Sequence, residues 1–213
     1  MSGSINNPNR AYWLKTLHQW HWISSAIALV GILLFSFTGI TLNHVAQLDA
    51  EPQIVNQTAQ LPTGLHGQLL ILGTRYEENR IAPDLPGALV NWLDETLSVN
   101  ASTSENEWSD RELYMSMQRP GGDAWLSINL LNGNVKYQNT DRGWIAYLND
   151  LHKGRYTGTA WSWFIDIVAV ACLLFSITGL LMLKMHASNR PSTWPLVGLG
   201  LLMPILIAIL SIH

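Results

Sequence analysis

Three long apolar segments constrain this chain more than any other feature of its sequence. They extend roughly from Trp22 to Leu42, from Trp163 to Leu183 and from Trp194 to Ile212. At about 1.5 Å of rise per helical residue, each segment is long enough to cross the roughly 30 Å hydrocarbon layer of a bilayer. Only 13% of the 213 residues are charged, and the apolar residues are concentrated in these segments. The sequence therefore predicts three transmembrane helices in a lipid bilayer.

The basic residues predict how these helices are oriented. Arg10 and Lys15 precede the first segment, Lys184 and Arg190 lie between the second and third, and neither region contains Asp or Glu. By the positive-inside rule, both regions are expected in the cytoplasm. The long middle segment and the C-terminal His213 would then lie on the exported side. The first apolar segment is too long for a signal peptide and has no small-residue cleavage site after it, so we expect it to be retained.

The predicted domain boundaries follow from these segments. We expect a cytoplasmic N-terminal segment, a first helix, an exported domain, a second helix, a cytoplasmic loop and a third helix, at residues 1–21, 22–44, 45–160, 161–185, 186–193 and 194–213. The exported domain is predicted to be α+β. A helical pattern runs from about Leu85 to Leu97, and three alternating stretches between Glu112 and Tyr137 predict an antiparallel meander. The polar stretch from Ala101 to Asp110 is predicted to be a loop.

A short motif occurs twice, near the end of each of the first two apolar segments. It reads LLFSFTG at Leu33–Gly39 and LLFSITG at Leu173–Gly179. Histidines flank both segments: His18, His21, His44, His152 and His186. If the two helices run in opposite directions, His44 would lie near His152 at one face of the membrane. His186 would lie near His18 and His21 at the other face.

Two facing sets of imidazoles between antiparallel helices are what bis-histidine ligation of haem requires. The single cysteine, Cys172, excludes covalent attachment through a pair of cysteines, so a haem would be of the b type. The anionic propionates of a haem need cationic partners, and the candidates are Arg155 outside and Arg10, Lys15 or Lys184 inside. The angle around the helix favours His18 as a ligand, whereas depth in the membrane favours His21. Both therefore remain candidates.

The histidine motifs resemble those of a known family. His18–Trp22 leads into a helix that ends at Thr38–His44, and Leu151–Arg155 leads into a helix that ends at Thr178 and Gly179. Together with the turns at residues 120–123 and 132–133, they resemble the PepSY-associated transmembrane proteins of Gram-negative inner membranes. The resemblance implies a membrane protein with a PepSY-like exported domain and one or two haem b groups, similar to ferric-siderophore reductases. Carried over by position, the axial ligands would be His18 or His21, His44, His152 and His186.

The expected function is electron transfer across the bilayer from a cytoplasmic donor or a quinol to an exported acceptor, such as a ferric chelate or a redox protein. The chain has no Gly-x-Gly-x-x-Gly fingerprint, so the electron donor is expected to be another molecule. The sequence leaves open whether the chain is itself a reductase or an electron-transfer subunit, and whether it forms a homo-oligomer. No nucleic-acid partner is expected.

The sequence also leaves two alternative functions open. In the first, the exported domain binds a peptide or protein, has no enzymatic activity, and the chain carries no haem. In the second, the flanking histidines handle a transition metal. Asp166 is the only carboxylate within an apolar segment. It is expected to be a proton site, a hydrogen-bond partner of a ligating histidine, or a side chain that the helix N-terminus tolerates.

Overall fold

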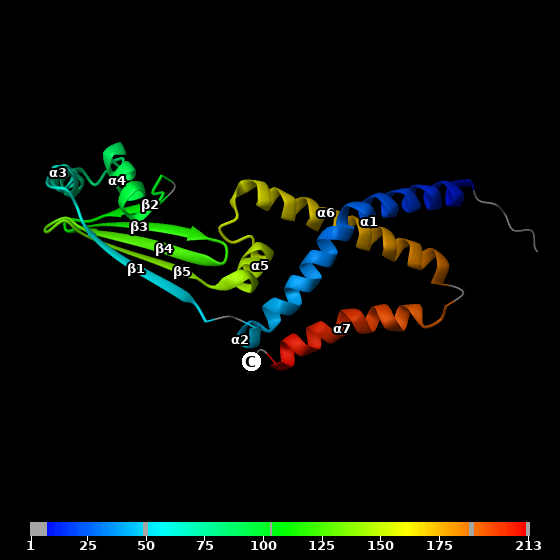
Figure 1. Cartoon of the computed structure of the whole chain (residues 1–213). Coiled ribbons are helices and arrows are strands. Elements are labelled where there is room, and N and C mark those ends of the chain that lie inside the picture. Colours follow the sequence, from blue (N-terminus) through cyan, green and yellow to red (C-terminus); the bar gives the residue numbers. More distant parts are fainter. Residues whose placement is uncertain (1–7, 49–50, 103, 188–189, 212–213) are drawn as a thin grey trace, which may run out of the picture. The chain divides into compact units, whose positions relative to one another are not determined.

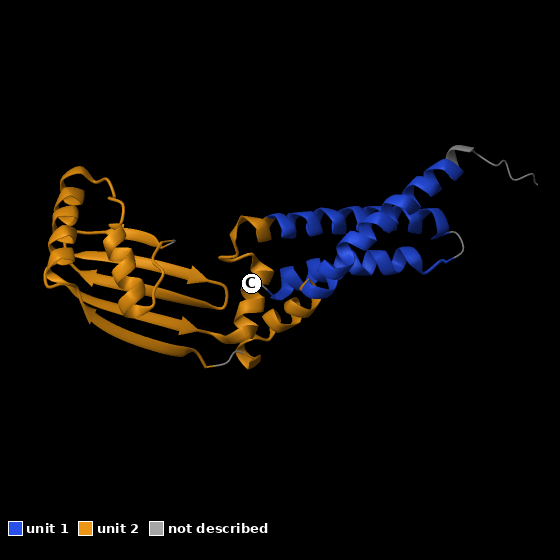
Figure 2. Ribbon diagram, turned by 45° about the horizontal axis from the view of Figure 1, so that its top comes forward, with its two compact units in different colours: residues 1–34, 163–213 blue, residues 35–162 orange. Residues whose placement is uncertain are grey.

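The computed structural model describes residues 8–48, 51–102, 104–187 and 190–211. Residues 1–7 of the predicted N-terminal segment and the C-terminal His213 lie outside the described residues. The chain divides into two compact units (Figure 2), one made of Met1–Leu34 with Trp163–His213 and the other of Phe35–Ser162. Three long apolar helices flank an α+β domain, which confirms the predicted fold class (Figure 1).

The three long helices are α1 (Pro8–Asn43), α6 (Gly158–His186) and α7 (Thr193–Ser211). All three are long and apolar enough to cross a membrane. Within the first unit, α1 and α6 approach closely where Gly31 meets Val168. A Cβ atom placed on Gly31 would lie only 2.4 Å from a methyl carbon of Val168. Glycine at this position therefore lets the two helix backbones approach, as small residues do in membrane helix pairs.

The α+β domain contains one antiparallel sheet in the order β1-β5-β4-β3-β2. Its strands are β1 (Gln53–Gln60), β2 (Glu105–Trp108), β3 (Glu112–Arg119), β4 (Gly122–Asn129) and β5 (Asn134–Asp141). Strands β3 to β5 are the predicted meander, and Gly121 and Gly133 occupy its turns at φ values of +73° and +70°. These values suit glycine because it lacks a Cβ atom.

The prediction of a loop from Ala101 to Asp110 is wrong, because β2 lies within it and pairs with β3. In β2 only Trp108 is buried, so its sequence lacks the alternation of apolar and polar residues that reveals a half-buried strand. A short helix, α2 (Val45–Leu48), follows α1.

Two helices cover one face of the sheet (Figure 1). They are α3 (Thr63–Asn79) and α4 (Gly87–Leu97). The second confirms the helical pattern seen in the sequence, because Leu89, Leu93 and Leu97 are buried in one core. That core also contains the inward side chains of the sheet: Leu113, Met115, Leu126, Ile128 and Val135. Each fully buried leucine or isoleucine stabilises the fold by about 1.5–3 kcal/mol.

The helix α5 (Gly143–Lys153) joins the sheet to α6. It ends at Gly154, which has a left-handed conformation with φ of 65°. The Asp150 carboxylate is 3% exposed, accepts a hydrogen bond from the Gly121 backbone N–H at 2.9 Å and pairs with Arg142 at 3.0 Å. These contacts fasten α5 to the turn between β3 and β4. They position the last turn of α5, which carries His152.

Candidate functional site: two imidazole seats and a histidine-lined cavity

The second copy of the repeated motif meets His21 at three of its residues. The Nδ1 atom of His21 lies 3.0 Å from Oγ1 of Thr178, and its ring stacks on Phe175 with centroids 4.5 Å apart and planes 19° apart. A Cβ atom on Gly179 would approach Cε1 of His21 to 3.4 Å, so glycine leaves room for the ring. We name Phe175, Thr178 and Gly179 the α6 seat.

The first copy of the motif contacts His152 at the same three positions, with a different ring geometry. The Nδ1 atom of His152 lies 2.6 Å from Oγ1 of Thr38, and the ring meets Phe35 edge to face, with centroids 5.2 Å apart. A Cβ atom on Gly39 would lie 3.7 Å from Cε1 of His152. We name Phe35, Thr38 and Gly39 the α1 seat. The duplicated sequence therefore builds a duplicated binding position for an imidazole.

The hydrogen bonds of each seat threonine favour the tautomer in which Nδ1 of the histidine carries the proton. The Thr178 hydroxyl donates to the Leu174 carbonyl at 2.6 Å, and the Thr38 hydroxyl donates to the Phe35 carbonyl at 3.4 Å. A hydroxyl has a single proton, so the oxygen is left to accept from the imidazole. With the hydroxyl proton on the carbonyl, Nδ1 of the seated ring is assigned as the donor. In the neutral imidazole, Nε2 keeps its lone pair and can bind a metal.

The remaining three flanking histidines have the same protonation pattern. Their Nδ1 atoms lie 2.9–3.0 Å from backbone carbonyl oxygens four residues earlier, of Leu14, Ile40 and Met182 for His18, His44 and His186 respectively. A carbonyl only accepts, so Nδ1 donates and Nε2 is again the nitrogen with a free lone pair. All three of these side chains are exposed in the structure. Unlike His21 and His152, they bond only to their own helix or the helix just before them.

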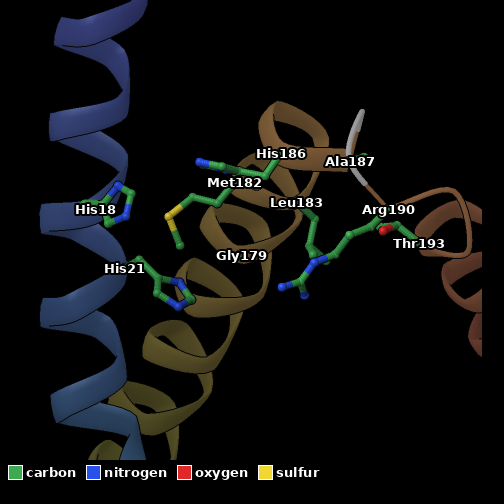
Figure 3. Close-up of a pocket in the computed structure, with 9 residues that line it drawn as sticks. All are labelled: His18, His21, Gly179, Met182, Leu183, His186, Ala187, Arg190 and Thr193. Carbon is green, nitrogen blue, oxygen red and sulfur yellow. The ribbon is translucent and has the colours of Figure 1, made fainter.

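Three of the histidines line one cavity of about 650 Å³ in the first unit (Figure 3). His18 and His21 extend from α1 toward α6, and His186 extends from α6 toward α1, with Met182 beside it. The Arg190 side chain points into the cavity from beyond the end of α6. Within the described ranges, no three His, Cys, Asp or Glu side chains are arranged to hold a bare metal ion. The histidines therefore surround a space, and its volume is typical of a small-molecule or cofactor site, at about 300–1,000 Å³.

The other predicted site residues lie elsewhere. His44 follows the last residue of α1, six positions after the threonine of the α1 seat. Arg155 lines a groove of about 230 Å³ on the α+β domain, together with Trp125 and Arg142. Asp166 lines an apolar groove between α1 and α6. Lys15 and Lys184 are exposed, and the side chain of Arg10 lies outside the described residues.

Sequence reasoning missed the roles of two kinds of residue. Arg190 was used only to predict the orientation of the helices. Its position four residues after His186 was a signal that the two side chains could line the same site. The threonines of the two seats were recognised only as members of the repeated motif. The repetition of the whole motif was the signal that pointed to a more specific role.

A family model described as PepSY_TM-like matches residues 12–213. The match includes both seats, the α+β domain and all five flanking histidines. It confirms the resemblance that the histidine motifs and the turns indicated. No curated protein and no solved structure matches the chain.

Proposed function

The chain belongs to the PepSY_TM-like family of membrane proteins, and from this premise we propose that it is a b-type cytochrome that carries electrons across the bacterial inner membrane. The observation that carries the proposal is the cavity lined by His18, His21 and His186, in which each imidazole has its Nδ1 atom occupied and its Nε2 atom available. Nitrogen ligands from two helices on either side of one cavity are the donor set for bis-histidine haem.

The residues around this cavity fit a haem in size, polarity and charge. Met182 and Leu183 provide apolar contact for a flat macrocycle, and the Arg190 guanidinium is a partner for an anionic propionate. When bound, a haem iron with two imidazole ligands supplies one-electron transfer without an open coordination position. The chain's own residues would orient the ligands and exclude water.

The α6 seat favours His21 over His18 as the ligand from α1. The His21 ring is held by Thr178 and stacked on Phe175, whereas the His18 ring bonds only to its own helix. A hydrogen bond to the second nitrogen of a ligating imidazole fixes its orientation and raises its basicity. We therefore assign His21 and His186 as the axial ligands on the cytoplasmic side, with His18 as a neighbour.

The α1 seat supports a second haem on the exported side. His152 is held by Thr38 as His21 is held by Thr178, and His44 follows the end of α1 as its proposed partner ligand. His21 precedes the first apolar segment and Thr38 lies near its end, so in a segment long enough to cross the bilayer two such groups would serve the two faces of the membrane.

The proposed orientation places the N-terminal end of α1 and the connection between α6 and α7 in the cytoplasm. This follows from the basic residues of both regions and from their lack of Asp and Glu. The α+β domain is then exported, with Arg155 available to an anionic group there. Electrons would come from a cytoplasmic donor or a quinol and leave to a ferric chelate or a redox protein outside.

Single histidine variants test the assignment. We expect His21→Ala and His186→Ala to remove one haem, and His44→Ala and His152→Ala to remove the other, as measured by haem content and reduced-minus-oxidised spectra. His66→Ala is the matched control, because His66 bonds to the Leu130 carbonyl inside the α+β domain. Unchanged haem content in all four ligand variants would contradict the proposal.

A second candidate function is ligand binding by the α+β domain in a protein without haem. It is favoured by the groove on the sheet face that α3 and α4 leave open, where Tyr114 stacks with Trp125 near Arg142 and Arg155. A colourless purified protein that binds a peptide in this groove would support this second function over the first.

A further inference from the structure

A second cavity in the first unit is a groove of about 310 Å³ between α1 and α6. Trp20, Ile23 and Ile27 line it from α1. From α6 it is lined by Trp163, Asp166, Ile167, Val170 and Leu174. The Ser24 hydroxyl, which also lines the groove, already donates to the His21 carbonyl at 3.1 Å. The groove is therefore mainly apolar and contains one carboxylate.

Across the part of the chain that the structure describes, no hydrogen bond or ion pair reaches the Asp166 carboxylate. A carboxylate within a membrane-spanning helix is costly and generally marks a functional position. Asp166 accepts hydrogen bonds, so the ligand that complements it is a hydroxyl donor that enters from the bilayer.

The shape of the groove indicates the rest of the ligand. From Trp163 to Leu174, its α6 side follows one stripe of the helix for about 16 Å. An elongated apolar surface of this kind suits a hydrocarbon chain. A phospholipid would bring its anionic phosphate toward the carboxylate, which like-charge repulsion disfavours. A ligand with a neutral, hydroxyl-bearing head group and a long apolar tail fits this groove. Its hydroxyl would meet the Asp166 carboxylate and its tail would lie along the apolar side chains.

We propose that this groove binds a membrane hydroquinone with an isoprenoid tail. One phenolic hydroxyl donates to Asp166, the ring lies against Trp163, and the tail follows Ile167, Val170 and Leu174. Leu174 connects the groove to the α6 seat, because its side chain lines the groove and its backbone carbonyl contacts the seat. The Leu174 carbonyl accepts the hydroxyl of Thr178, which holds His21.

The redox part of this inference rests on the proposed function. Oxidation of the hydroquinone to the quinone releases two electrons and two protons. The two haem groups of the proposed function would be the acceptors, one electron each. The Asp166 carboxylate would take one proton, and the other would pass to water at the membrane surface. The groove would thus be the entry point for electrons.

Photolabelling tests the binding claim without reference to haem. An azido-substituted hydroquinone probe is added to the full-length protein in lipid nanodiscs, and the sample is irradiated. The labelled peptides are then identified by mass spectrometry. We expect labels on the groove segments of α1 and α6 that an excess of unlabelled ubiquinol removes. Asp166→Leu should weaken the apparent affinity about tenfold, because it removes a charged hydrogen-bond acceptor.

Two tryptophan variants provide a matched pair. Val170→Trp fills the groove and should abolish labelling, whereas Leu173→Trp adds the same side chain at an exposed position of α6 that does not line the groove. Asp166→Asn keeps an acceptor but cannot take a proton, so it should keep labelling and lose hydroquinone-dependent haem reduction. Equal labelling of the Val170→Trp and Leu173→Trp proteins, or labelling that ubiquinol does not displace, would overturn the binding claim.

The two proposals fail in different ways. Specific labelling of a protein without haem would support the binding site and count against the cytochrome. A haem protein that dithionite reduces but that shows no specific labelling would support the cytochrome and overturn the hydroquinone site.

Discussion

The substitution Thr178→Val removes one hydroxyl from the α6 seat and keeps the branched shape of the side chain. Thr178 is 7% exposed, and its Oγ1 atom lies 3.0 Å from Nδ1 of His21. In the variant, the ring can still stack on Phe175, but its N–H group loses its acceptor. The variant therefore isolates the hydrogen bond from the rest of the seat.

The expected magnitude follows from the position of this bond. Hydrogen bonds between membrane helices are worth about 0.6 kcal/mol on average and up to about 1.7 kcal/mol. Leaving a buried donor without a partner costs about 1–3 kcal/mol. Because His21 is only half-buried, we expect the free energy of unfolding to fall by about 1–2 kcal/mol. Loss of a partner that orients a metal ligand lowers metal affinity about 10–100-fold, and we expect the lower end of that range for haem.

Haem titration of the apoprotein, followed by absorbance, measures the affinity. Thr178→Ser is the matched control, because it retains the hydroxyl, and should bind haem nearly as the native protein does. A double-mutant cycle with His21→Ala isolates the coupling energy between the two side chains. Native haem affinity and native unfolding free energy in Thr178→Val would refute the role of the seat, as would equal losses in the Ser and Val variants.

Three further substitutions test other contacts. Gly31→Leu should destabilise the pairing of α1 with α6 in detergent unfolding, since its Cβ atom would clash with Val168, and an added Val168→Ala should recover part of the loss. Gly154→Val forces a branched residue into a left-handed conformation at a cost of about 1–2 kcal/mol, and should lower the content of the haem assigned to His152. Asp150→Ala should destabilise the α+β domain by about 1.5–3 kcal/mol, seen as faster proteolysis, because it removes a buried charged acceptor.

The sequence predicted the elements whose form depends on the spacing of nearby residues. The alternation in β3 and β4 and the glycine in the turn before β5 predicted the meander, and the spacing of buried leucines predicted α4. The strand β1 escaped prediction because Ile54 and Val55 are exposed and its polar residues show no apolar alternation. Its position depends on pairing with β5, from Gln53 opposite Asp141 to Gln60 opposite Asn134. Pairing between distant segments leaves little trace in the local sequence.

The candidate site was predictable to a similar extent. The flanking histidines stood out in the sequence, because imidazoles at the ends of apolar segments repeat with the motif. The sequence did not reveal the partners of their Nδ1 atoms, because the contact of His21 with Thr178 requires one register of α1 against α6. That register depends on how Gly31 packs against Val168, which is a property of the folded helix pair.

The pyridine haemochrome spectrum of the purified full-length protein tests most directly whether the seated imidazoles bind haem. We predict the spectrum of protohaem, at one or two groups per chain, and its loss when His21 and His152 are both replaced by alanine. A protein that contains no protohaem after expression with ample haem precursor, or a double variant with the full native haem content, would contradict the assignment.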